Sequence, residues 1–534
     1  MTTVYFKVCR WLDNDDYRLL TEFSEYEGRR DGCSIFRLDF HKMKRNGYTL
    51  LDVVSILEDL EGVDEGSIDA IRRLTEELRK AVIELGEDGR IHVRSRFYLK
   101  PVFEEARILL PYDPAKKAYT APGHLYARLR DILEGAGLVV EDRTGILERR
   151  LPRKLSFRGE LREYQKEALQ AWAEAGYRGV IVLPTGAGKT VVAIAGMAML
   201  NLWTLVVVYT KEHVKQWMDS IRKFTDAGGL VGAYYGDEKR LSPITVTTYQ
   251  TAYRKIRLFA DKFPLIIFDE AHHLPADKFR TIATGMLAPY RMGLSATIKR
   301  EDGRHEELFS LLGGVVYNST PHDLMKKGYL APYRIVRVKV DPLPEEKARY
   351  EKLKKEYRLL AAGRTFQEIL SAAKKGDKTA IEALRRHAEM REIIQSSRAK
   401  LKEVTRIALE EARKGRKVIV FTQYRKQAEE IAKMTGGMLL HGGLDKDTRQ
   451  RILDRFKNSD SGILVVTTVG DEGLDIPDAE VGILASGTGS SRQFIQRLGR
   501  LIRPMPGKTA VLYEVVLAGT SEEYQSRRRR QMSL

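Results

Sequence analysis

The chain of 534 residues contains only two cysteines, Cys9 and Cys33. Two thiols cannot build a multi-cysteine zinc site or an iron–sulfur cluster, and they provide no disulfide framework; a redox role for either is a secondary interpretation. The sequence also lacks any run of roughly 18 consecutive apolar residues, which argues against a membrane-spanning helix. The start, "MTTVYFKVCRWLDNDD", has neither the basic segment nor the apolar core of a signal peptide. We therefore expect a cytoplasmic protein, nucleoid-associated if prokaryotic, with no membrane partner.

Charge is abundant and uneven. The formal net charge is +18, and a basic surface attracts polyanions, of which nucleic acid is the commonest. The first 150 residues are close to neutral and lean acidic, so the positive excess belongs to residues 151–534. A surface rich in ion pairs, as in thermophiles, would raise both signs together and explains the surplus less well.

Residues 1–150 indicate a small α+β region ahead of a larger module. Residues 1–90 end in a helical pattern, "SIDAIRRLTEELRKAVIEL", and the turn "GEDGR". Residues 91–150 contain a strand-like "IHVRSRFYL" and the helix "HLYARLRDILEGAG". The sequence assigns no role to residues 1–90.

From residue 151 the pattern changes to short apolar strands alternating with helices, which is typical of parallel sheets covered on both faces. One series, in 151–330, is "VIVLP", "TLVVVYT", "PITVTTY", "LIIFDEAHH" and "RMGLSAT". A second, in 415–534, is "KVIVFTQY", "GMLLHGG", "GILVVTTV", "EVGILASG" and "TAVLYEVV". Residues 331–414 read as a linker and a basic helical insertion, with a plain solvated helical pair as the alternative. We predict an α/β protein with two doubly wound parallel-sheet domains.

The stretch "LPTGAGKT", residues 183–190, follows a predicted strand and opens a predicted helix. Its glycines let backbone amides turn toward phosphate oxygens, and the helix adds its positive amino-terminal end. In this pattern Lys189 reaches the β- and γ-phosphates of ATP, and the Thr190 hydroxyl ligates Mg2+. Leu183 stands where the strict pattern has a glycine, so a chance glycine-rich turn is the alternative. The other loop residues predicted to hold nucleotide are Thr185, Gly186, Ala187 and Gly188.

Two acids follow about eighty residues later, at the end of the apolar run "LIIFDEAHH". Asp269 is suited to hold Mg2+, and Glu270 to orient and deprotonate the attacking water. A helix cap is the alternative for adjacent acids at a strand end. Together with the phosphate loop, the pair predicts an ATP hydrolase.

These motifs, taken in order, resemble those of the superfamily 2 helicases and translocases. "LREYQKEAL" is similar to the adenine-reading glutamine motif, with Gln165, and "SAT" at 295–297 to motif III. "TTVGDEGLDIP" resembles motif V and "QFIQRLGRLIR" resembles motif VI. The resemblance implies two RecA-like domains with ATP between them. It assigns nucleotide contacts to Gly473 and Asp475 and catalytic roles to Gln496, Arg500 and Arg503, since arginine can stabilise charge on the transferred phosphoryl group.

Further features are similar to the archaeal-like XPB-type helicases, a DEAH-box branch. "SATIKREDGRHEELFSLLGG" resembles the XPB segment whose Arg-Glu-Asp triplet, here Arg300, Glu301 and Asp302, is implicated in unwinding. The helical insertion resembles in position a thumb-like element that grips DNA, and residues 91–150 a damage-recognition-like domain. The missing cysteine cluster argues against the XPD type.

By the same resemblance, DNA contacts fall on residues at strand ends: Thr210, Lys211, Thr248, Tyr249, Thr467 and Thr468. Each hydroxyl has a helix cap as its alternative role, and we expect His441 to order a loop.

The leading hypothesis is an ATP- and Mg2+-dependent DNA helicase that moves 3′ to 5′ on forked or partly single-stranded DNA. The alternatives are a duplex translocase that does not separate strands, and an ATP-switched assembly factor that recruits a nuclease or a transcription or repair partner.

Overall fold

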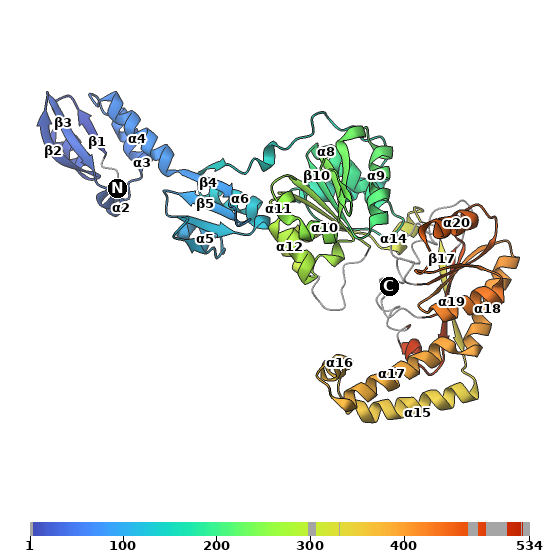
Figure 1. Ribbon diagram of the computed structural model, residues 1–534. Coiled ribbons are helices and arrows are strands. Elements are labelled where there is room, and N and C mark those ends of the chain that lie inside the picture. Colours follow the sequence, from blue (N-terminus) through green and yellow to red (C-terminus); the bar gives the residue numbers. More distant parts are fainter. Residues whose placement is uncertain are drawn as a thin grey trace. The chain divides into compact units, whose positions relative to one another are not determined.

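The computed structural model describes residues 4–296, 306–330, 332–467, 479–486, 510–524 and 526 (Figure 1). The chain divides into two compact units. The first comprises residues 1–149 together with Ile256–Pro264 and Ala283–Pro289, and the second comprises the remainder. Within the described ranges, no helix combines the length and the apolar character needed to cross a bilayer.

The first unit begins with an antiparallel sheet of three strands in the order β1-β3-β2, on which helices pack. One face of the sheet is buried, with Phe6, Val8 and Phe36 fully enclosed against Leu57 and Ile71 of the helices. The elements are β1 (Tyr5–Val8), β2 (Ser24–Arg30), β3 (Cys33–Leu38), α1 (Asn14–Thr21), α2 (Phe40–Asn46), α3 (Leu50–Asp59) and α4 (Glu65–Leu78).

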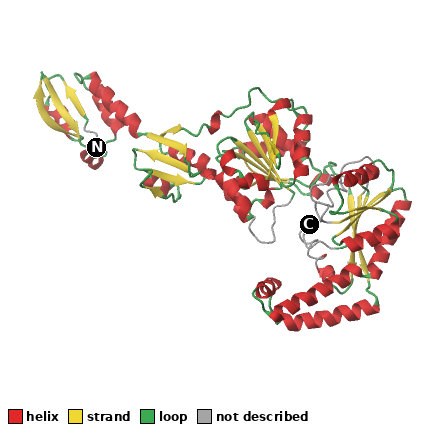
Figure 2. Cartoon of the chain, in the orientation of Figure 1, coloured by secondary structure: helices red, strands yellow, loops and turns green. Residues whose placement is uncertain are grey.

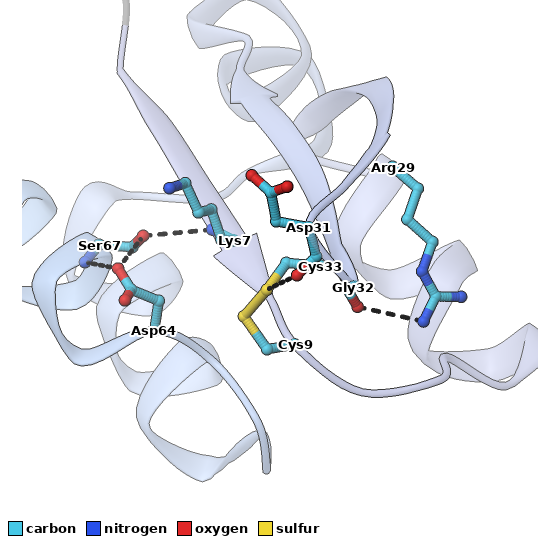
Figure 3. Close-up of a disulfide and its surroundings, with 8 residues drawn as sticks. All are labelled: Lys7, Cys9, Arg29, Asp31, Gly32, Cys33, Asp64 and Ser67. Carbon is cyan, nitrogen blue, oxygen red and sulfur yellow. Dashed lines mark hydrogen bonds between the residues drawn. A yellow bond between two sulfur atoms is a disulfide. The ribbon is translucent and has the colours of Figure 1, made fainter.

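Cys9 and Cys33 form a disulfide (Figure 3). The two thiols were expected to provide no disulfide framework, and this single bond corrects that expectation. Its cause is the register of β1 and β3, which pairs Val8 with Ser34 and therefore sets the next residue, Cys9, opposite Cys33. Nearby, the Lys7 amide donates to the Ser67 hydroxyl, at 3.2 Å, which attaches α4 to β1 (Figure 3).

A second sheet follows, with five strands in the order β6-β7-β5-β4-β8. Its elements are β4 (Lys80–Leu85), β5 (Ile91–Ser95), β6 (Tyr112–Asp113), β7 (Ala118–Ala121), β8 (Val139–Asp142), α5 (Lys100–Glu105) and α6 (Tyr126–Gly135). The core under this sheet also includes Ala260 and Leu287, from the two later segments that belong to this unit.

The predicted helix across residues 67–85 is wrong in its last turns. The helix ends at Leu78, and Lys80–Leu85 is the strand β4, which pairs with β5 and β8. Sheet pairing and the burial of Ala81 and Ile83 outweigh the helical pattern there. The turn "GEDGR" is confirmed, closed by a bond from the Gly86 amide to the Arg90 carbonyl, but it joins β4 to β5. A boundary at residue 90 would therefore cut a hairpin.

The second unit contains an eight-stranded sheet in the order β12-β11-β13-β10-β14-β15-β9-β16, parallel except for β12. Its strands are β9 (Arg178–Val182), β10 (Thr204–Val208), β11 (Val231–Tyr235), β12 (Glu238–Lys239), β13 (Ile244–Thr248), β14 (Leu265–Asp269), β15 (Tyr290–Ser295) and β16 (Val315–Asn318). Helices flank the strands (Figure 2). They include α7 (Glu163–Glu174), α8 (Lys189–Leu200), α9 (Lys211–Phe224), α10 (Tyr249–Arg254), α12 (Asp277–Gly285), α13 (Glu307–Leu312) and α14 (Pro321–Lys326).

A second parallel sheet has six strands in the order β17-β22-β21-β18-β20-β19. Its strands are β17 (Tyr333–Val340), β18 (Lys417–Thr422), β19 (Met438–Leu440), β20 (Gly462–Thr467), β21 (Val481–Leu484) and β22 (Ala510–Leu517). The helices α18 (Arg398–Arg413), α19 (Arg425–Thr435) and α20 (Lys446–Lys457) accompany it. The predicted fold class, α/β with two doubly wound parallel sheets, is confirmed.

The helical insertion is shorter than the predicted 331–414. Strand β17 pairs with β22 along its whole length, and α18 buries Leu401, Val404 and Ala408 in the core of the second sheet. Both therefore belong to the second domain. What remains is a helical arm, α15 (Pro344–Ala361), α16 (Phe366–Lys374) and α17 (Lys378–Ser396), in which α15 and α17 lie side by side (Figure 1).

Candidate nucleotide site

The glycine-rich loop joins β9 to α8 at the carboxyl end of its sheet. Gly186 and Gly188 have φ angles of +84° and +76°, a backbone conformation that favours glycine. Gly188 is also the residue from which α8 starts, and a Cβ there would come within 2.5 Å of the Gln165 side-chain nitrogen. The loop thus has the curled backbone and the helix start that a phosphate cradle requires.

Gln165 fixes the glycine-rich loop through side-chain hydrogen bonds. Its Nε2 donates to the Ala187 carbonyl at 2.9 Å, and its Oε1 accepts from the Arg162 amide. The Tyr164 hydroxyl donates to the same Ala187 carbonyl at 2.8 Å. Both side chains come from the first turn of α7 and are buried. Gln165 therefore supports the loop directly, and its adenine contact remains a prediction.

Two side chains of the loop, those of Lys189 and Thr185, are suited to bind an anionic ligand. Lys189 Nζ folds back over the loop and donates to the Leu183 carbonyl, at 3.1 Å, and to that of Pro184, at 3.4 Å. The Thr185 hydroxyl is buried and has no hydrogen-bond partner among the described residues. A phosphate would give the hydroxyl an acceptor and Lys189 a charged partner, so these residues fit the phosphates of ATP.

The two predicted acids lie at the same sheet edge as the loop. Strands β14, β15 and β9 are neighbours, and their register aligns Asp269 with Leu294 and Leu294 with Ile181, two residues before Leu183. The Leu183 amide donates to the Ser295 carbonyl at 3.0 Å, which joins the loop to the end of β15. The sheet therefore brings together the two motifs that the sequence separates by about eighty residues.

Each acid is oriented by named contacts. Asp269 Oδ2 accepts from the indole Nε1 of Trp217 at 2.8 Å, and its Oδ1 accepts from the Glu270 amide. Glu270 has a φ of +52°, a left-handed conformation that costs free energy in a residue other than glycine. Such strain is characteristic of functional positions, where the fold imposes a side-chain direction that the local sequence disfavours.

His272 links Glu270 to the end of β15, a contact that the sequence reasoning missed. Its Nδ1 lies 3.2 Å from Glu270 Oε2 and 3.0 Å from the Ser295 hydroxyl, and its ring is almost wholly buried. The signal was present in "DEAHH", where the histidine two positions after the glutamate carries a buried polar ring beside a carboxylate.

The structure corrects the predicted role of Tyr249. It was predicted to contact DNA, but its ring is fully buried and its hydroxyl donates to the Asp269 carbonyl at 3.0 Å. Burial raises its pKa, and the nearby Asp269 and Glu270 charges add to the effect. Tyr249 therefore packs under the acids and does not face a ligand.

The threonines predicted to bind DNA mostly have structural contacts. Thr210 accepts from the His213 amide and caps α9, and Thr248 accepts from the Thr251 amide and caps α10. Thr467 ends β20 and is buried. Lys211 is exposed at the start of α9. His441 does order a loop, as predicted, because its Nδ1 accepts from the Gly443 amide at 3.1 Å.

Several predicted residues lie outside the described ranges: Arg300, Glu301, Asp302, Thr468, Gly473, Asp475, Gln496, Arg500 and Arg503. Thr190, on the first turn of α8, is half-buried. Its contact with Mg2+ stays a prediction.

Two family models match the chain. Residues 158–300 match the model described as the res subunit of type III restriction enzymes, and residues 399–505 match the helicase conserved C-terminal domain. The first match includes both the loop and the acids, and the two matches together span the strands of both parallel sheets except β16, β17 and β22.

Three relatives share most of the chain. The DNA 3′-5′ translocase XPB2 of Sulfurisphaera tokodaii is 38% identical over 431 residues, which are 79% of this chain and 96% of that protein. The DNA 3′-5′ helicase XPB of Mycobacterium tuberculosis is 31% identical over 76% of this chain and 69% of its own length. The XPB helicase/translocase subunit of general transcription and DNA repair factor IIH from Antonospora locustae is 29% identical over 66% of this chain, but only 50% of that protein is covered. The loop, the acids at its sheet edge and these similarities agree, and the chain belongs to the XPB family of superfamily 2 DNA helicases.

Proposed function

We propose that this protein is an ATP-dependent DNA motor that moves 3′ to 5′ and separates strands, in DNA repair or transcription. The observation that carries the proposal is the gathering of the Lys189 loop, Asp269 and Glu270 at one edge of one sheet. The similar proteins from Sulfurisphaera tokodaii and Mycobacterium tuberculosis are a DNA 3′-5′ translocase and a DNA 3′-5′ helicase, which supports this direction and this polymer.

In this proposal, each residue at the sheet edge has a separate role in ATP hydrolysis. ATP with Mg2+ supplies the phosphoanhydride bond and offsets the charge that develops on the transferred phosphoryl group. Thr190 and Asp269 carry the oxygen ligands that would hold Mg2+. Lys189 exchanges its contacts with two carbonyls for phosphate oxygens, and Glu270 orients and deprotonates the attacking water. His272 and Trp217 keep the two carboxylates in position.

In this proposal, the second parallel-sheet domain couples ATP hydrolysis to movement on DNA by changing its position relative to the first. We infer by resemblance that Gln496, Arg500 and Arg503 complete the nucleotide site, with Gly473 and Asp475 beside them. A nucleotide held by both domains favours a closed arrangement, and loss of the γ-phosphate removes that preference. Alternation between two arrangements is what a motor on DNA requires.

DNA binding in this proposal depends mainly on phosphate contacts, which suit the positive excess after residue 150. Lys211, exposed at a helix start on the first large sheet, is one contact of this kind. The triplet Arg300, Glu301 and Asp302 would act at the point of unwinding. We further infer a cytoplasmic, nucleoid-associated protein whose first 150 residues offer a docking surface for a nuclease or transcription partner.

The test is ATP hydrolysis measured in parallel with single-stranded DNA, duplex, forked DNA and RNA, each across a salt series. The proposal predicts the strongest stimulation by forked or single-stranded DNA, decreasing steeply with salt. Equal stimulation by RNA, or none by any polymer, would overturn it.

A duplex translocase is the second candidate, favoured by the match of residues 158–300 to a restriction-enzyme motor. Strand displacement and triplex displacement separate the two functions. A helicase displaces a paired strand from a fork, whereas a pure translocase displaces only the third strand of a triplex.

A further inference from the structure

A cavity of about 590 Å3 lies between the helical arm and the second parallel sheet, within the second unit. On the sheet side it is bounded by Gln423 and Tyr424, which directly follow β18, and by Ser486, which lies two residues after β21. On the arm side it is bounded by residues of α15, α16 and α17. Parallel α/β sheets bind ligands at the carboxyl ends of their strands, and the volume is that of a small-ligand pocket.

The sheet side of the cavity is fixed in position by hydrogen bonds. The Gln423 amide donates to the Ser486 hydroxyl at 2.7 Å, and that hydroxyl lies 3.2 Å from the Thr422 hydroxyl. Tyr424 follows, and its phenol oxygen accepts from Arg391 at 3.2 Å. This contact joins α17 to the end of β18 across the cavity, so the rim is formed before any ligand enters.

Aromatic rings from separate elements surround the space. The rings of Phe366 and His387 lie at a tilt of 45°, with centroids 5.0 Å apart, while Tyr350 and Tyr424 contribute from α15 and the sheet. Tyr524, which follows β22, is 78% exposed although it lines the cavity. Large exposed rings facing a preformed space provide flat surfaces on which a planar ligand can stack.

The cavity is positively charged. Its lining includes Lys354, Arg358 and Arg391, of which only Lys354 has an ion pair among the described residues, with Glu351 at 3.1 Å. The single carboxylate of the lining, Glu522, is already neutralised by Lys400 at 2.6 Å. Burial, together with the nearby Arg391, lowers the pKa of His387, which favours its neutral ring, and the charges of Arg358 and Arg391 face an anion in the cavity.

We propose that this cavity binds one unstacked nucleotide of a single DNA strand, with the base against Tyr524 and Phe366 and the phosphate against Arg358 and Arg391. The inference rests on the proposed DNA motor and adds a base contact between the arm and the motor. Stacking is indifferent to base identity, as a motor that moves along any sequence requires. Arginine suits the phosphate because its planar head forms paired hydrogen bonds.

The test uses the full chain without ATP and two labelled single-stranded oligonucleotides of equal length, measured by fluorescence anisotropy. One has normal bases and the other has abasic residues at every second position, so both present the same phosphates. The proposal predicts that the normal strand binds at least about fivefold more tightly, the lower range of base stacking on an aromatic ring. Tyr524→Ala and Phe366→Ala should each reduce that preference, whereas Tyr524→Phe retains it.

Matched controls separate the cavity from general effects. Arg391→Ala should weaken binding of both oligonucleotides, whereas Arg385→Ala, on the same helix but outside the lining, should not. Leu359→Ala, exposed on α15 outside the lining, should also leave binding unchanged.

Three results would overturn the inference. An undiminished base preference in both Tyr524→Ala and Phe366→Ala would overturn the cavity while leaving the DNA motor intact. Competition by a free deoxynucleoside monophosphate as effective as the strand itself would assign the cavity to a small molecule. If the wild-type protein binds neither oligonucleotide, both the cavity proposal and the proposed function fail.

Discussion

The Lys400 ammonium group donates to both carboxylate oxygens of Glu522, at 2.6 and 2.7 Å, and both side chains are buried. The pair joins α18 to the segment after β22, and Glu522 also accepts from the Leu517 amide at 3.1 Å. A buried charge without its partner is costly, so Lys400→Met should lower the free energy of unfolding by about 3–5 kcal/mol. Adding Glu522→Gln, which keeps an acceptor for Leu517, should recover most of that loss. Denaturant unfolding checks both variants, and equal destabilisation by the single and double variants would contradict this explanation.

The disulfide should stabilise the N-terminal sheet and nothing beyond it. Cys9 and Cys33 are 24 residues apart in the sequence, and the bond lowers the chain entropy of the unfolded state by an amount that corresponds to about 3.5 kcal/mol. In Cys9→Ser/Cys33→Ser, amide hydrogen exchange should accelerate in β1 and β3, since these strands are joined by the bond. Exchange in α8 and the rate of ATP hydrolysis should match the wild type. Unchanged protection in β1 and β3 would show that the sheet does not depend on the bond.

We expect Trp217 to raise the rate of ATP hydrolysis through a single hydrogen bond that positions Asp269. Its indole donates to Asp269 Oδ2, and a bond to a charged group contributes about 1.5–3 kcal/mol. Trp217→Phe should reduce kcat for ATP by about tenfold, because a change of about 1.4 kcal/mol in the barrier has that effect. Trp172→Phe is the control: its indole donates to the Arg291 carbonyl at the other end of the sheet, so it should lower stability with little change in kcat. Similar kcat values for the two variants would contradict a positioning role.

We expect the stability of the five-stranded sheet to depend on pH through Asp88. Burial alone would raise the pKa of this carboxyl, but hydrogen bonds from Lys116, the Arg90 amide and His92 outweigh it and hold the pKa well below its usual range. Between the two pKa values the unfolded chain binds more protons than the folded one, so the contribution is complete above the unfolded value of about 3.9 and declines as pH falls below it. The difference in unfolding free energy between wild type and Asp88→Asn should therefore be constant from pH 5 to 7 and shrink toward pH 3. A difference independent of pH would show that the charge is not involved.

Much of the motor fold could be predicted because its strands are short, apolar and separated by turn residues. All ten predicted strands exist, and the loop and acids fall at strand ends as the spacing required. What the sequence could not provide is long-range pairing. Strand β17 is separated from its partner β22 by about 170 residues, and only that pairing assigns it to the second domain. The Cys9–Cys33 bond depends in the same way on the β1–β3 register.

The roles of individual strand-end residues could be predicted less well. The motif position of Tyr249 predicts a DNA contact, but the structure buries its ring and bonds its hydroxyl to the Asp269 carbonyl. Thr248 caps α10, the alternative role for its hydroxyl, and its DNA contact stays a prediction. Strand-end hydroxyl groups satisfy helix amides as readily as ligands, and a single sequence does not distinguish the two roles. The contacts of His272 could be predicted only in part, because Glu270 lies two residues away in the sequence whereas Ser295 meets the ring only across the neighbouring strand β15.

The most direct test of an ATP-driven motor in this chain is DNA-stimulated ATP hydrolysis by Lys189→Ala. This side chain is the one cation of the loop, and its loss leaves the carbonyls of Leu183 and Pro184 open to water without altering the buried core. We expect that hydrolysis stimulated by single-stranded or forked DNA is abolished in this variant while DNA binding without ATP is retained. Full activity in this variant would contradict a motor driven from the glycine-rich loop.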